Sequence, residues 1–578
     1  MNVATMSMSE MDAALVEKPK DFTVRSQRAS ARLTAGNRRG AYEDAQQALA
    51  DAGGAPSIEL LAIASRIALA LGRIEECEKL VVDGLSRGPS ADELHGILGG
   101  AMQQAKRWPE AVRAYERALN LNPFRRTYRI ALGQTLEQMN DLGRAERVYR
   151  HGLHVDDQFG DAALNLANLL QRRERFQEAL SWYQKAIALL GPQPHIYSNI
   201  GALHRKTRNY ALAHRAYRIS GTLKPGDSGM HYNLGNLLRA EDRIPEADAA
   251  YRRAIAGRPK NAEFHWNRAL ALLAGGDLAK GFREYEWRWE YENFPSRKRS
   301  FSQPMWEGGS FDGRVLLIHT EQGVGDVLQF IRFLPRIVAL KGKTGRIVLE
   351  CHDTLMTLLK GYPGVDQIIE RFAPPPAFDM HLPLLSAPLV LGVSTLEDVQ
   401  ADVPYLPIPD GAPLAVDAAD PRRLKVGFVF GGNPKFSNDR ERSTSLDSWM
   451  RLFAVKGTQF FCLQKGDREP EVDKTPESVV RVNTLIHDFR DTALIMRQLD
   501  LVITTCTSVA HLAGALGVPF WVVLSRNPDW RWLIGREDSP WYPTARLFRQ
   551  EKPGEWEAVF ARVEAALHEF VAINAPST

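Results

Sequence analysis

The stretch WPEAVRAYERALNLNP (residues 108–123) has the pattern of one amphipathic helix that ends at a proline. Ala111 and Tyr115 are four residues apart and therefore fall on one face of that helix. Pro123 cannot continue it. The pattern returns at a constant interval of 34 residues, which places tyrosines at Tyr115, Tyr149, Tyr183, Tyr217, Tyr251 and Tyr285. A fixed period of this kind predicts a stack of similar helical units.

Two further positions keep the same phase. A small residue stands four before each tyrosine, at Ala111, Ala145, Ala179, Ala213, Ala247 and Gly281, and a second recurs at Gly99, Gly133, Ala167, Gly201, Gly235 and Ala269. Small side chains let the two helices of a unit approach closely. The pattern resembles the tetratricopeptide repeat (TPR), which implies an α-solenoid, a TPR superhelix over residues 21–295. Degenerate helix pairs precede six clear repeats from about residue 91. We expect residues 1–20 to be disordered and residues 296–313 to form a linker.

An asparagine also recurs every 34 residues, on the first helix of four consecutive units, at Asn165, Asn199, Asn233 and Asn267. First helices line the concave groove of such a solenoid. A carboxamide donates and accepts hydrogen bonds, so it can pair with any peptide backbone. The series resembles the asparagine ladder of the protein O-linked N-acetylglucosamine transferases and predicts binding of an acceptor polypeptide. The alternative is that these side chains cap contacts between neighbouring repeats.

After Gly313 the periodicity changes to short apolar runs that alternate with helical segments. The runs are RVLLIH (314–319), RIVLEC (346–351), QIIE (367–370), FDMHLPLL (378–385), KVGFVF (425–430), FFCLQ (460–464), VVRVNT (479–484), LVITT (501–505) and FWVVLS (520–525). This alternation predicts doubly wound parallel sheets. We expect two Rossmann-like lobes, residues 314–410 and 424–550, with a Pro-rich stretch between them. A C-terminal helix within 551–578 is expected to cross back over the first lobe.

Three motifs indicate which known family the α/β half resembles. EQGVGDVLQFIRFLP (321–335) and DLVITTCTSVAHLAGALGVP (500–519) are similar to segments of the heptosyltransferases, and DWRWLIGREDSPWYPTARLFRQ (529–550) is similar to the tail of bacterial TPR-linked glycosyltransferases. The layout resembles the glycosyltransferase-B fold and, as a whole, the TPR flagellin glycosyltransferases. That resemblance implies transfer of a sugar from a nucleotide-sugar to Ser or Thr of a bound protein, with a CMP-nonulosonic acid as the implied donor and flagellin as the best guess for the acceptor.

Two segments of the second lobe are candidates for the donor site. Ligands of open α/β sheets bind at the carboxyl ends of strands, and a helix N-terminus offers free N–H groups to a phosphate. Glycines after a strand allow a ligand to approach the backbone closely. The donor-binding set is Gly431, Gly432, Asn433, Arg442, Gln464, Lys465, Thr507, Ser508 and His511, with Lys435 and Arg440 in the same glycine loop. The alternatives are an N-cap for Thr507, a core position for His511 and a solvated surface for the charged loop.

On the acceptor side, Asp326 closes the first loop of the first lobe. A carboxylate that faces the cleft can take a proton from an attacking hydroxyl, and in the heptosyltransferase pattern the matching Asp is the proposed base. Asp is also a favoured helix cap, so both interpretations stay open. His319 and Glu321 are the reserve candidates. The resembling families carry Asp where this chain has Cys506, which leaves the donor geometry and the activity itself open to question.

Composition excludes several other classes. A net charge of +4 over 578 residues does not indicate a nucleic-acid binder, and four scattered cysteines form neither a disulfide framework nor a metal motif. No signal peptide or membrane span is evident, so we expect a cytoplasmic enzyme without membrane insertion, metal or cofactor beyond the nucleotide-sugar. Two alternatives remain: a TPR scaffold or chaperone with an inactive transferase domain, and a transferase that acts on a glycan or lipid.

Overall fold

The computed structural model describes residues 6–407, 422–435 and 439–574, and the Pro-rich stretch expected between the lobes lies largely outside them. The chain divides into two compact units, Met1–Gly226 and Asp227–Thr578. The first unit is helical throughout its described residues. Its helices are α1 (Met8–Glu17), α2 (Phe22–Thr34), α3 (Arg38–Ala52), α4 (Ile58–Ala70), α5 (Ile74–Arg87), α6 (Asp92–Gln104), α7 (Trp108–Leu121), α8 (Arg126–Gln138), α9 (Leu142–Val155), α10 (Gly160–Arg172), α11 (Phe176–Leu190), α12 (Pro194–Lys206) and α13 (Tyr210–Leu223).

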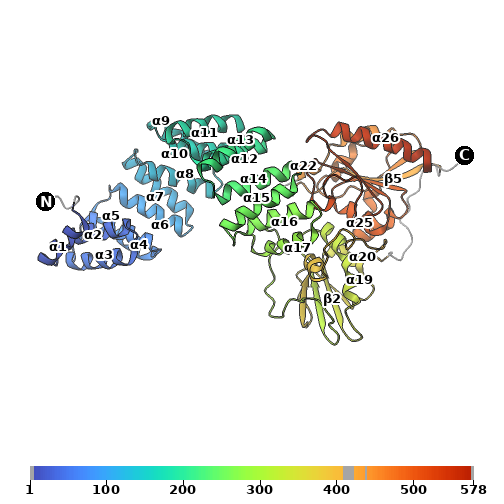
Figure 1. The fold of residues 1–578 in the computed structure, drawn as a ribbon, viewed down its shortest axis with the longest axis horizontal. Coiled ribbons are helices and arrows are strands. Elements are labelled where there is room, and N and C mark those ends of the chain that lie inside the picture. The colour runs from blue at the N-terminus through green and yellow to red at the C-terminus, as the bar shows by residue number, and fades with distance from the viewer. Residues whose placement is uncertain (1–5, 408–421, 436–438, 575–578) are drawn as a thin grey trace. The chain divides into compact units, whose positions relative to one another are not determined.

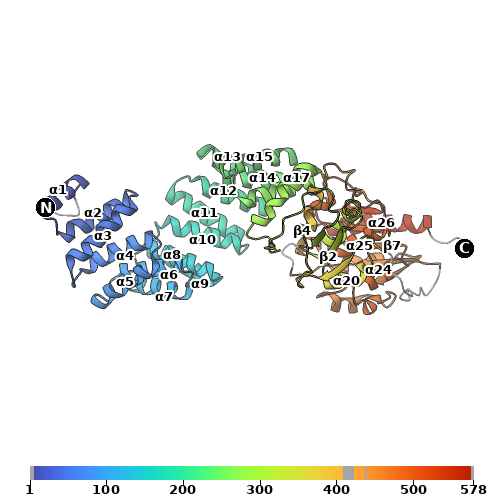
Figure 2. The ribbon, with the colours of Figure 1, turned by 90° about the horizontal axis from the view of Figure 1, so that it is seen from below.

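Consecutive helices of the first unit lie side by side as pairs (Figures 1 and 2), and the close approach depends on the small residues. A Cβ added at Gly99 would stand 2.6 Å from the ring of Tyr115, and one added at Gly133 would stand 2.3 Å from the ring of Tyr149. Gly201 meets Tyr217 in the same way at 2.5 Å. The recurring tyrosine therefore packs directly on the recurring glycine of its own unit.

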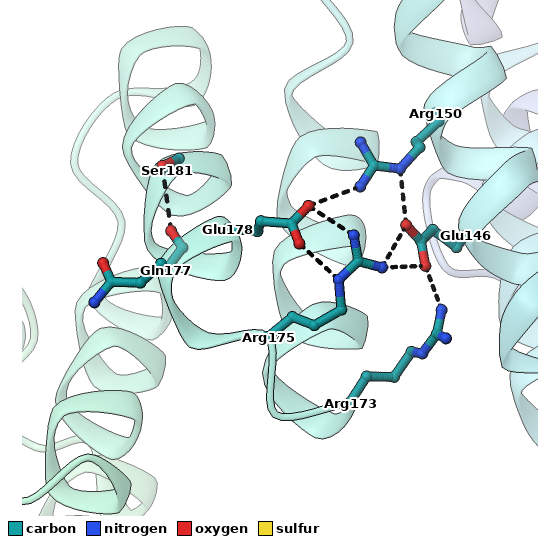
Figure 3. A network of polar contacts seen from close by, with 7 residues as sticks. All are labelled: Glu146, Arg150, Arg173, Arg175, Gln177, Glu178 and Ser181. Atoms are coloured by element: carbon teal, nitrogen blue, oxygen red, sulfur yellow. Dashed lines mark hydrogen bonds and ion pairs between the residues drawn. The ribbon is translucent and has the colours of Figure 1, made fainter.

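Charged side chains join neighbouring repeats on the surface of this unit (Figure 3). Glu146 on α9 accepts hydrogen bonds from Arg150 at 2.9 Å and from Arg175, at the start of α11, at 2.9 Å, and it is ion-paired with Arg173. Arg150 and Arg175 also hold Glu178 of α11, at 3.2 and 2.6 Å. Partly exposed pairs contribute little one by one, but a shared network fixes α9 against α11.

The N-terminus differs from its prediction. Residues 8–17 form helix α1 rather than a disordered segment, because Ser7 and Glu10 form a reciprocal capping box at its start. Met11 and Leu15 are buried against Val24 of α2. The sequence prediction weighed the polar residues of this segment and overlooked its apolar stripe.

The second unit begins with the last two helix pairs and continues into two parallel sheets. Its helices are α14 (Ser228–Ala240), α15 (Ile244–Gly257), α16 (Ala262–Ala274), α17 (Leu278–Tyr285), α18 (Val324–Phe330), α19 (Leu334–Val338), α20 (Asp353–Leu359), α21 (Ala387–Val390), α22 (Asp439–Arg442), α23 (Met450–Phe453), α24 (Phe489–Met496), α25 (Ser508–Leu516) and α26 (Trp556–Asn574). Its strands are β1 (Val315–His319), β2 (Arg346–Cys351), β3 (Gln367–Glu370), β4 (Met380–Pro383), β5 (Leu424–Val429), β6 (Thr458–Cys462), β7 (Leu501–Thr505), β8 (Phe520–Leu524) and β9 (Ala545–Arg549).

The first lobe contains the sheet β3-β2-β1-β4 and the second lobe the sheet β6-β5-β7-β8-β9, and every pair of neighbouring strands is parallel. The strand order reverses between β1 and β4 in the first sheet and between β5 and β7 in the second. Such reversals leave a crevice beyond the carboxyl ends of the strands, where open α/β sheets bind ligands. The α/β prediction for this half is confirmed at this level.

Three local predictions were wrong. Helix α26 packs on the second lobe rather than over the first: Phe560 and Val563 are buried against the face of the sheet that holds Phe428, and Figure 1 shows α26 along that sheet. The run 479–484 forms one bridge, Phe461 to Val480, followed by a 3₁₀ turn. The helical segment expected between the runs 314–319 and 346–351 is not one helix: it breaks at Ile331–Phe333, just before Pro335, which cannot donate a backbone hydrogen bond.

Candidate functional site

The starts of two helices, one from each lobe, meet in the second unit. Helix α18 follows β1 and helix α25 follows β7. A Cβ added at Gly325 would stand 3.0 Å from His511 Cδ2 and 3.4 Å from the Cα of Ser508. A side chain at this position would be in tight contact with His511, so glycine favours the close approach of the two helix starts. The loops predicted for the acceptor and the donor side are therefore neighbours.

Asp326 lies at this contact with both oxygens engaged. Its Oδ2 accepts a hydrogen bond of 2.8 Å from the backbone N–H of Gly323, and its Oδ1 is ion-paired with Arg531. Its side chain keeps 19% of its surface exposed. Burial raises the pKa of Asp326, and the positive charge of Arg531 opposes that rise. A carboxylate has about four lone-pair positions, so these two contacts leave capacity for a substrate hydroxyl.

Arg531, which the sequence reasoning missed, holds this region together. It belongs to the 3₁₀ turn Trp530–Trp532, is almost fully buried and binds Asp529 Oδ1 at 2.8 Å in addition to Asp326. Burial alone would raise the pKa of Asp529, but Arg531 outweighs it and lowers that pKa. The signal was present in the motif DWRW, where an arginine stands between two tryptophans. The sequence analysis used this motif only for the family resemblance.

The neighbouring tryptophans extend the same contact. Trp530 packs edge-on against Phe282 of α17 and Phe330 of α18, with ring centroids 6.0 and 6.4 Å apart. Trp532 stacks on His511 and donates its Nε1–H to Cys506 Sγ at 3.1 Å. Burial raises the pKa of Cys506 to about 11, so the residue is a neutral thiol. One short turn thus touches the last repeat helix and both lobes.

A second buried cluster lies at the carboxyl end of β1. Arg288, of the 3₁₀ turn Glu286–Glu290, is fully buried and donates to Glu321 Oε1 and to Ser386 Oγ, both at 2.7 Å. Burial raises the pKa of Glu321 to about 7. Within the described residues its Oε2 has no hydrogen-bond partner. His319 contacts His381 at 3.2 Å, and burial lowers the pKa of His319 to about 3. Both reserve candidates are enclosed, whereas Asp326 is partly exposed.

The start of α25 has the features expected of an anion site. Thr507 is the N-cap in extended backbone, and it makes no side-chain capping bond to the helix. The N–H of Ala510 donates to the backbone oxygen of Thr507 at 3.1 Å, and the Thr507 side chain satisfies none of the N–H groups of the first turn. His511 differs from its prediction: it is 6% exposed, its Nδ1 contacts Tyr542 Oη at 2.8 Å, and burial lowers its pKa to about 3. It is a neutral histidine packed between the lobes.

The glycine loop after β5 lies beside the same helix start. Arg442 donates to the backbone oxygen of Cys506 at 3.3 Å and to Asp439 at 3.1 Å. A Cβ added at Gly432 would meet the Arg442 guanidinium at 2.5 Å. Asn433 is exposed and caps a turn through the N–H of Lys435, at 2.9 Å. The side chain of Arg440 lies outside the described residues. Arg442 is thus the cation that the structure brings to the α25 start.

Two predicted donor residues are engaged by groups of their own lobe. Gln464 is buried, accepts the N–H groups of Phe430 and Gly431 at 3.2 and 3.1 Å, and donates to the backbone oxygen of Gly431 at 3.1 Å. It therefore shapes the glycine loop and offers no free amide. Lys465 donates to Glu469 at 2.9 Å and to the backbone oxygen of Asn483 at 3.2 Å. Both positions end a strand, but their side chains bind their own lobe.

In the first unit, two of the predicted asparagines line one groove of about 520 Å³. Asn199 Nδ2 donates to Asn168 Oδ1 at 2.8 Å, and Asn165 Nδ2 donates to the backbone oxygen of Asp161 at 2.8 Å. The sequence analysis missed the glutamines of the same surface. The groove is lined by Gln103, Gln134, Glu137, Gln138, Asn165, Asn168, Gln171, Arg172, Tyr183 and Asn199. Its lining is rich in side chains that both donate and accept.

The other two asparagines belong to the second unit. Asn267 Nδ2 donates to Tyr232 Oη at 3.0 Å and to the backbone oxygen of Glu263 at 3.1 Å. Asn233 lies half-buried on α14. The contacts of Asn267 are those of a side chain that bridges two repeats, as the alternative interpretation predicted for it.

Residues 6–407, 422–435 and 439–574 hold no group of three or more His, Cys, Asp or Glu side chains that could hold a metal ion. In the same part of the chain, no helix has the length and apolarity needed to cross a bilayer.

Comparison with known families agrees with the helical architecture. Residues 130–194 match the Tetratricopeptide repeat family, and residues 229–276 match the TPR repeat family. The chain carries tetratricopeptide repeats. A crystal structure of a tetratricopeptide repeat protein from Parabacteroides merdae aligns with 43% of this chain and 98% of its own, at 16% identity and a TM-score of 0.37.

Two curated relatives differ in how much of this TPR chain they match. Protein FlbA of Caulobacter vibrioides is 27% identical over 530 residues, which cover 86% of this chain and 87% of that protein. The human Protein O-mannosyl-transferase TMTC1 is 26% identical over 167 residues, which cover 28% of this chain and only 19% of that protein. The match to FlbA therefore includes the TPR repeats and much of the α/β half.

Proposed function

We propose that the chain is a protein O-glycosyltransferase of the glycosyltransferase-B type, which moves a sugar from a nucleotide-sugar to Ser or Thr of a protein held by its repeats. The observation that carries the proposal is the contact of α18 with α25. It brings a partly exposed carboxylate, an uncapped helix start and the cation Arg442 to the carboxyl ends of three parallel strands. Asp326, the two glycines of the loop, Arg442, Thr507 and Ser508 form the proposed site.

The chemistry follows from these groups. The acceptor hydroxyl attacks the anomeric carbon, the bond from that carbon to the phosphate oxygen breaks, and the proton goes to Asp326. The leaving nucleotide phosphate is stabilised by the N–H groups at the start of α25 and by Arg442. Arg531 keeps the Asp326 carboxylate oriented through its Oδ1. No metal ion has a role in this proposal.

Support for a protein acceptor comes from the repeats and from the relatives. The groove of the first unit offers amide groups that suit an extended backbone, and one partial relative is named a protein O-mannosyl-transferase. Flagellin and a CMP-nonulosonic acid remain the best candidates for acceptor and donor, on the resemblance to the TPR flagellin glycosyltransferases. A glycan or lipid acceptor would leave the groove without a role.

One observation favours a scaffold without activity. Cys506, where the resembling families have Asp, is a neutral thiol that accepts a hydrogen bond from the indole of Trp532. Intact-mass measurement of candidate acceptor proteins, made in cells with and without this chain, separates the two functions. A mass increase that depends on the chain supports transfer, and unchanged masses for all candidates refute it.

A binding experiment identifies the donor. Purified chain is mixed with CMP-, UDP-, ADP- and GDP-activated sugars, and the unfolding temperature is measured. A ligand present at 100 times its Kd stabilises the folded state by about 2.7 kcal/mol, which is readily detected. A shift with one nucleotide class names the donor, and the absence of any shift favours the scaffold.

A further inference from the structure

One repeat of the first unit carries a charge unlike its neighbours. Residues 191–224, which form α12 and α13, contain six Lys and Arg and neither Asp nor Glu. The preceding interval, residues 157–190, contains four basic and four acidic residues. The cations of the 191–224 repeat therefore have no acidic partner within their own repeat, and Lys206 reaches Glu174 of the preceding interval at 3.3 Å.

Two of these cations occupy the next positions of the series that lines the groove. Gln103, Glu137 and Gln171 line it at intervals of 34 residues, and the next member of that series is Arg205. Gln138 and Arg172 also line it, and the next member of their series is Lys206. Glu137 and Arg172 are ion-paired with each other, so the two series change from amides and a balanced pair to two cations on α12.

The hydrogen bonding changes at the same position. In the three preceding repeats the recurring tyrosine donates to the groove residue twelve positions earlier: Tyr115 to Gln103 at 2.9 Å, Tyr149 to Glu137 at 2.6 Å and Tyr183 to Gln171 at 2.7 Å. In the repeat 191–224 that position holds Arg205, which can only donate and which faces the hydroxyl of buried Tyr217. Within the described residues, Arg205 Nε has no hydrogen-bond partner, and a carboxylate provides an acceptor for it.

Arg208 lies between the two helices of this repeat, and Arg215 and Arg218 lie on the outer helix α13. All three are exposed, and they raise the local potential without lining the groove. A membrane surface is a poor occupant, because the apolar stripe of α13, which includes Ala213 and Tyr217, is buried inside the solenoid. A protein segment fits better, since its backbone pairs with the carboxamides and its acidic side chains meet the cations.

We infer that the groove of the first unit binds an extended, acidic protein segment whose carboxylates lie against Arg205 and Lys206. This inference deepens the proposed function, because it names the class of acceptor segment that the repeats select. Charge complementarity of this kind chiefly sets specificity and the rate of encounter.

The test measures binding alone, with the full chain and no sugar donor. Fluorescence anisotropy follows two labelled peptides of about 16 residues, one a repeat of Glu-Ser-Ala-Ser and the other its Gln-Ser-Ala-Ser counterpart. We expect the acidic peptide to bind about tenfold more tightly or better, with an affinity that falls as salt is raised. Equal affinity for the two peptides would overturn the inference.

Two double variants with the same loss of charge locate the site. Arg205→Gln with Lys206→Gln is expected to reduce binding of the acidic peptide to the level of the neutral one. Arg215→Gln with Arg218→Gln, on the outer helix, is expected to reduce it by about twofold or less, through the screened field alone. Equal effects of the two pairs would contradict a groove site. If the first pair impairs folding, Lys206→Gln alone serves, because 48% of that side chain is exposed.

A single-stranded oligonucleotide of matched length is the remaining probe. Tighter binding than the acidic peptide, lost equally in both double variants, would overturn the choice of a protein partner. The outcome of this binding test does not depend on whether the chain transfers sugar. A chain that prefers the acidic peptide but never transfers sugar supports this inference and refutes the proposed function, and transfer by a chain that binds both peptides equally does the reverse.

Discussion

Arg531 determines how its neighbour Asp326 can act. A buried guanidinium between two carboxylates is stable only while both keep their charge, and removal of one partner of a buried pair is costly. Sequence reasoning treated Asp326 as a base or a helix cap. The structure adds a third role, since its carboxylate also balances a buried cation.

Asp326→Asn is therefore expected to affect activity and stability by different amounts. Sugar transfer should fall by about 10²–10⁴-fold if the carboxylate accepts the proton. Stability should fall by less than the roughly 3–5 kcal/mol of a fully broken buried pair, because Asp529 still faces Arg531. Transfer assays and urea unfolding measure the two effects.

Asp529→Asn is the matched control. It removes the other carboxylate from the same guanidinium and leaves α18 intact. We expect a similar loss of stability with transfer largely retained. If both variants lose transfer to the same degree, Asp326 serves only to balance Arg531, and a different proton acceptor is required.

The raised pKa of Glu321 predicts that the stability of the folded chain depends on pH. Its pKa in the folded chain is about 7, above the ordinary value of about 4.3, so the folded state binds this proton more tightly than the unfolded state. The stabilisation that protonated Glu321 contributes to the folded state is fully present below a pH of about 4.3, and it is lost as the pH rises through about 7. Each unit of pKa difference corresponds to about 1.4 kcal/mol.

Glu321→Gln removes this titration. The stability of the natural chain relative to the variant should therefore decrease between pH 4 and pH 7.5, and parallel curves would contradict the assignment. Tryptophan fluorescence suits the measurement, because ten of the twelve tryptophans belong to the second unit. Glu43→Gln, in which an exposed side chain of the first unit loses the same charge, is the control.

At the scale of elements, the contact between α18 and α25 depends on a missing side chain. Gly325→Ala would place a methyl group 3.0 Å from His511 and 3.4 Å from the backbone of Ser508. Overpacking of this kind costs about 1–3 kcal/mol and separates the two helix starts, so transfer should fall together with stability. Transfer assays and thermal unfolding of the variant measure both losses.

Gly323→Ala, two residues earlier, is its control. A methyl group there meets only Asp326 Oδ2, at an ordinary 3.4 Å. If the Gly325→Ala chain is as active and as stable as the Gly323→Ala chain, the close approach of the two helices contributes to neither transfer nor stability.

Much of the secondary structure could be predicted at this scale. The runs 346–351, 367–370 and 501–505 match β2, β3 and β7 residue for residue, because buried parallel strands are continuous apolar runs. β9 was missed, since ARLFR alternates arginine with apolar residues and lies at the sheet edge. The run 479–484 was predicted as a strand because of its valines. Its second half instead forms the 3₁₀ turn, in which the Asn483 side chain donates to Glu469 at 3.0 Å.

The candidate site was predictable only in part. Strand ends and glycines indicate which loops face the crevice, so Asp326, Arg442, Thr507 and Ser508 could be found from the chain alone. The inward direction of Gln464 and the burial of His511 depend on tertiary contacts that no local pattern encodes. Arg531 and Asp326 are 205 residues apart in the sequence. Two residues separated in this way form no repeating pattern from which their ion pair could be predicted.

For the whole molecule, the proposed chemistry predicts independence of divalent metals. Removal of metal ions with EDTA should leave transfer within about twofold of its initial rate, because Arg442 and the α25 N–H groups neutralise the leaving phosphate. The measurement compares rates with and without chelator, and then after addition of Mg²⁺ or Mn²⁺. Loss of transfer with EDTA and recovery with either metal would contradict this mechanism.

The shared core of the second unit sets where this protein can be recombined. Leu273, Phe282 and Tyr285 of the last repeat helices are buried in one cluster with both sheets, and the N–H of Ile534 donates to the backbone oxygen of Ala274 at 3.1 Å. The sequence placed the end of the repeats at residue 295, whereas the compact unit begins at Asp227. A chimaera that exchanges repeats between relatives should therefore be joined near Gly226. A junction near 295 would separate the α/β half from part of its own hydrophobic core.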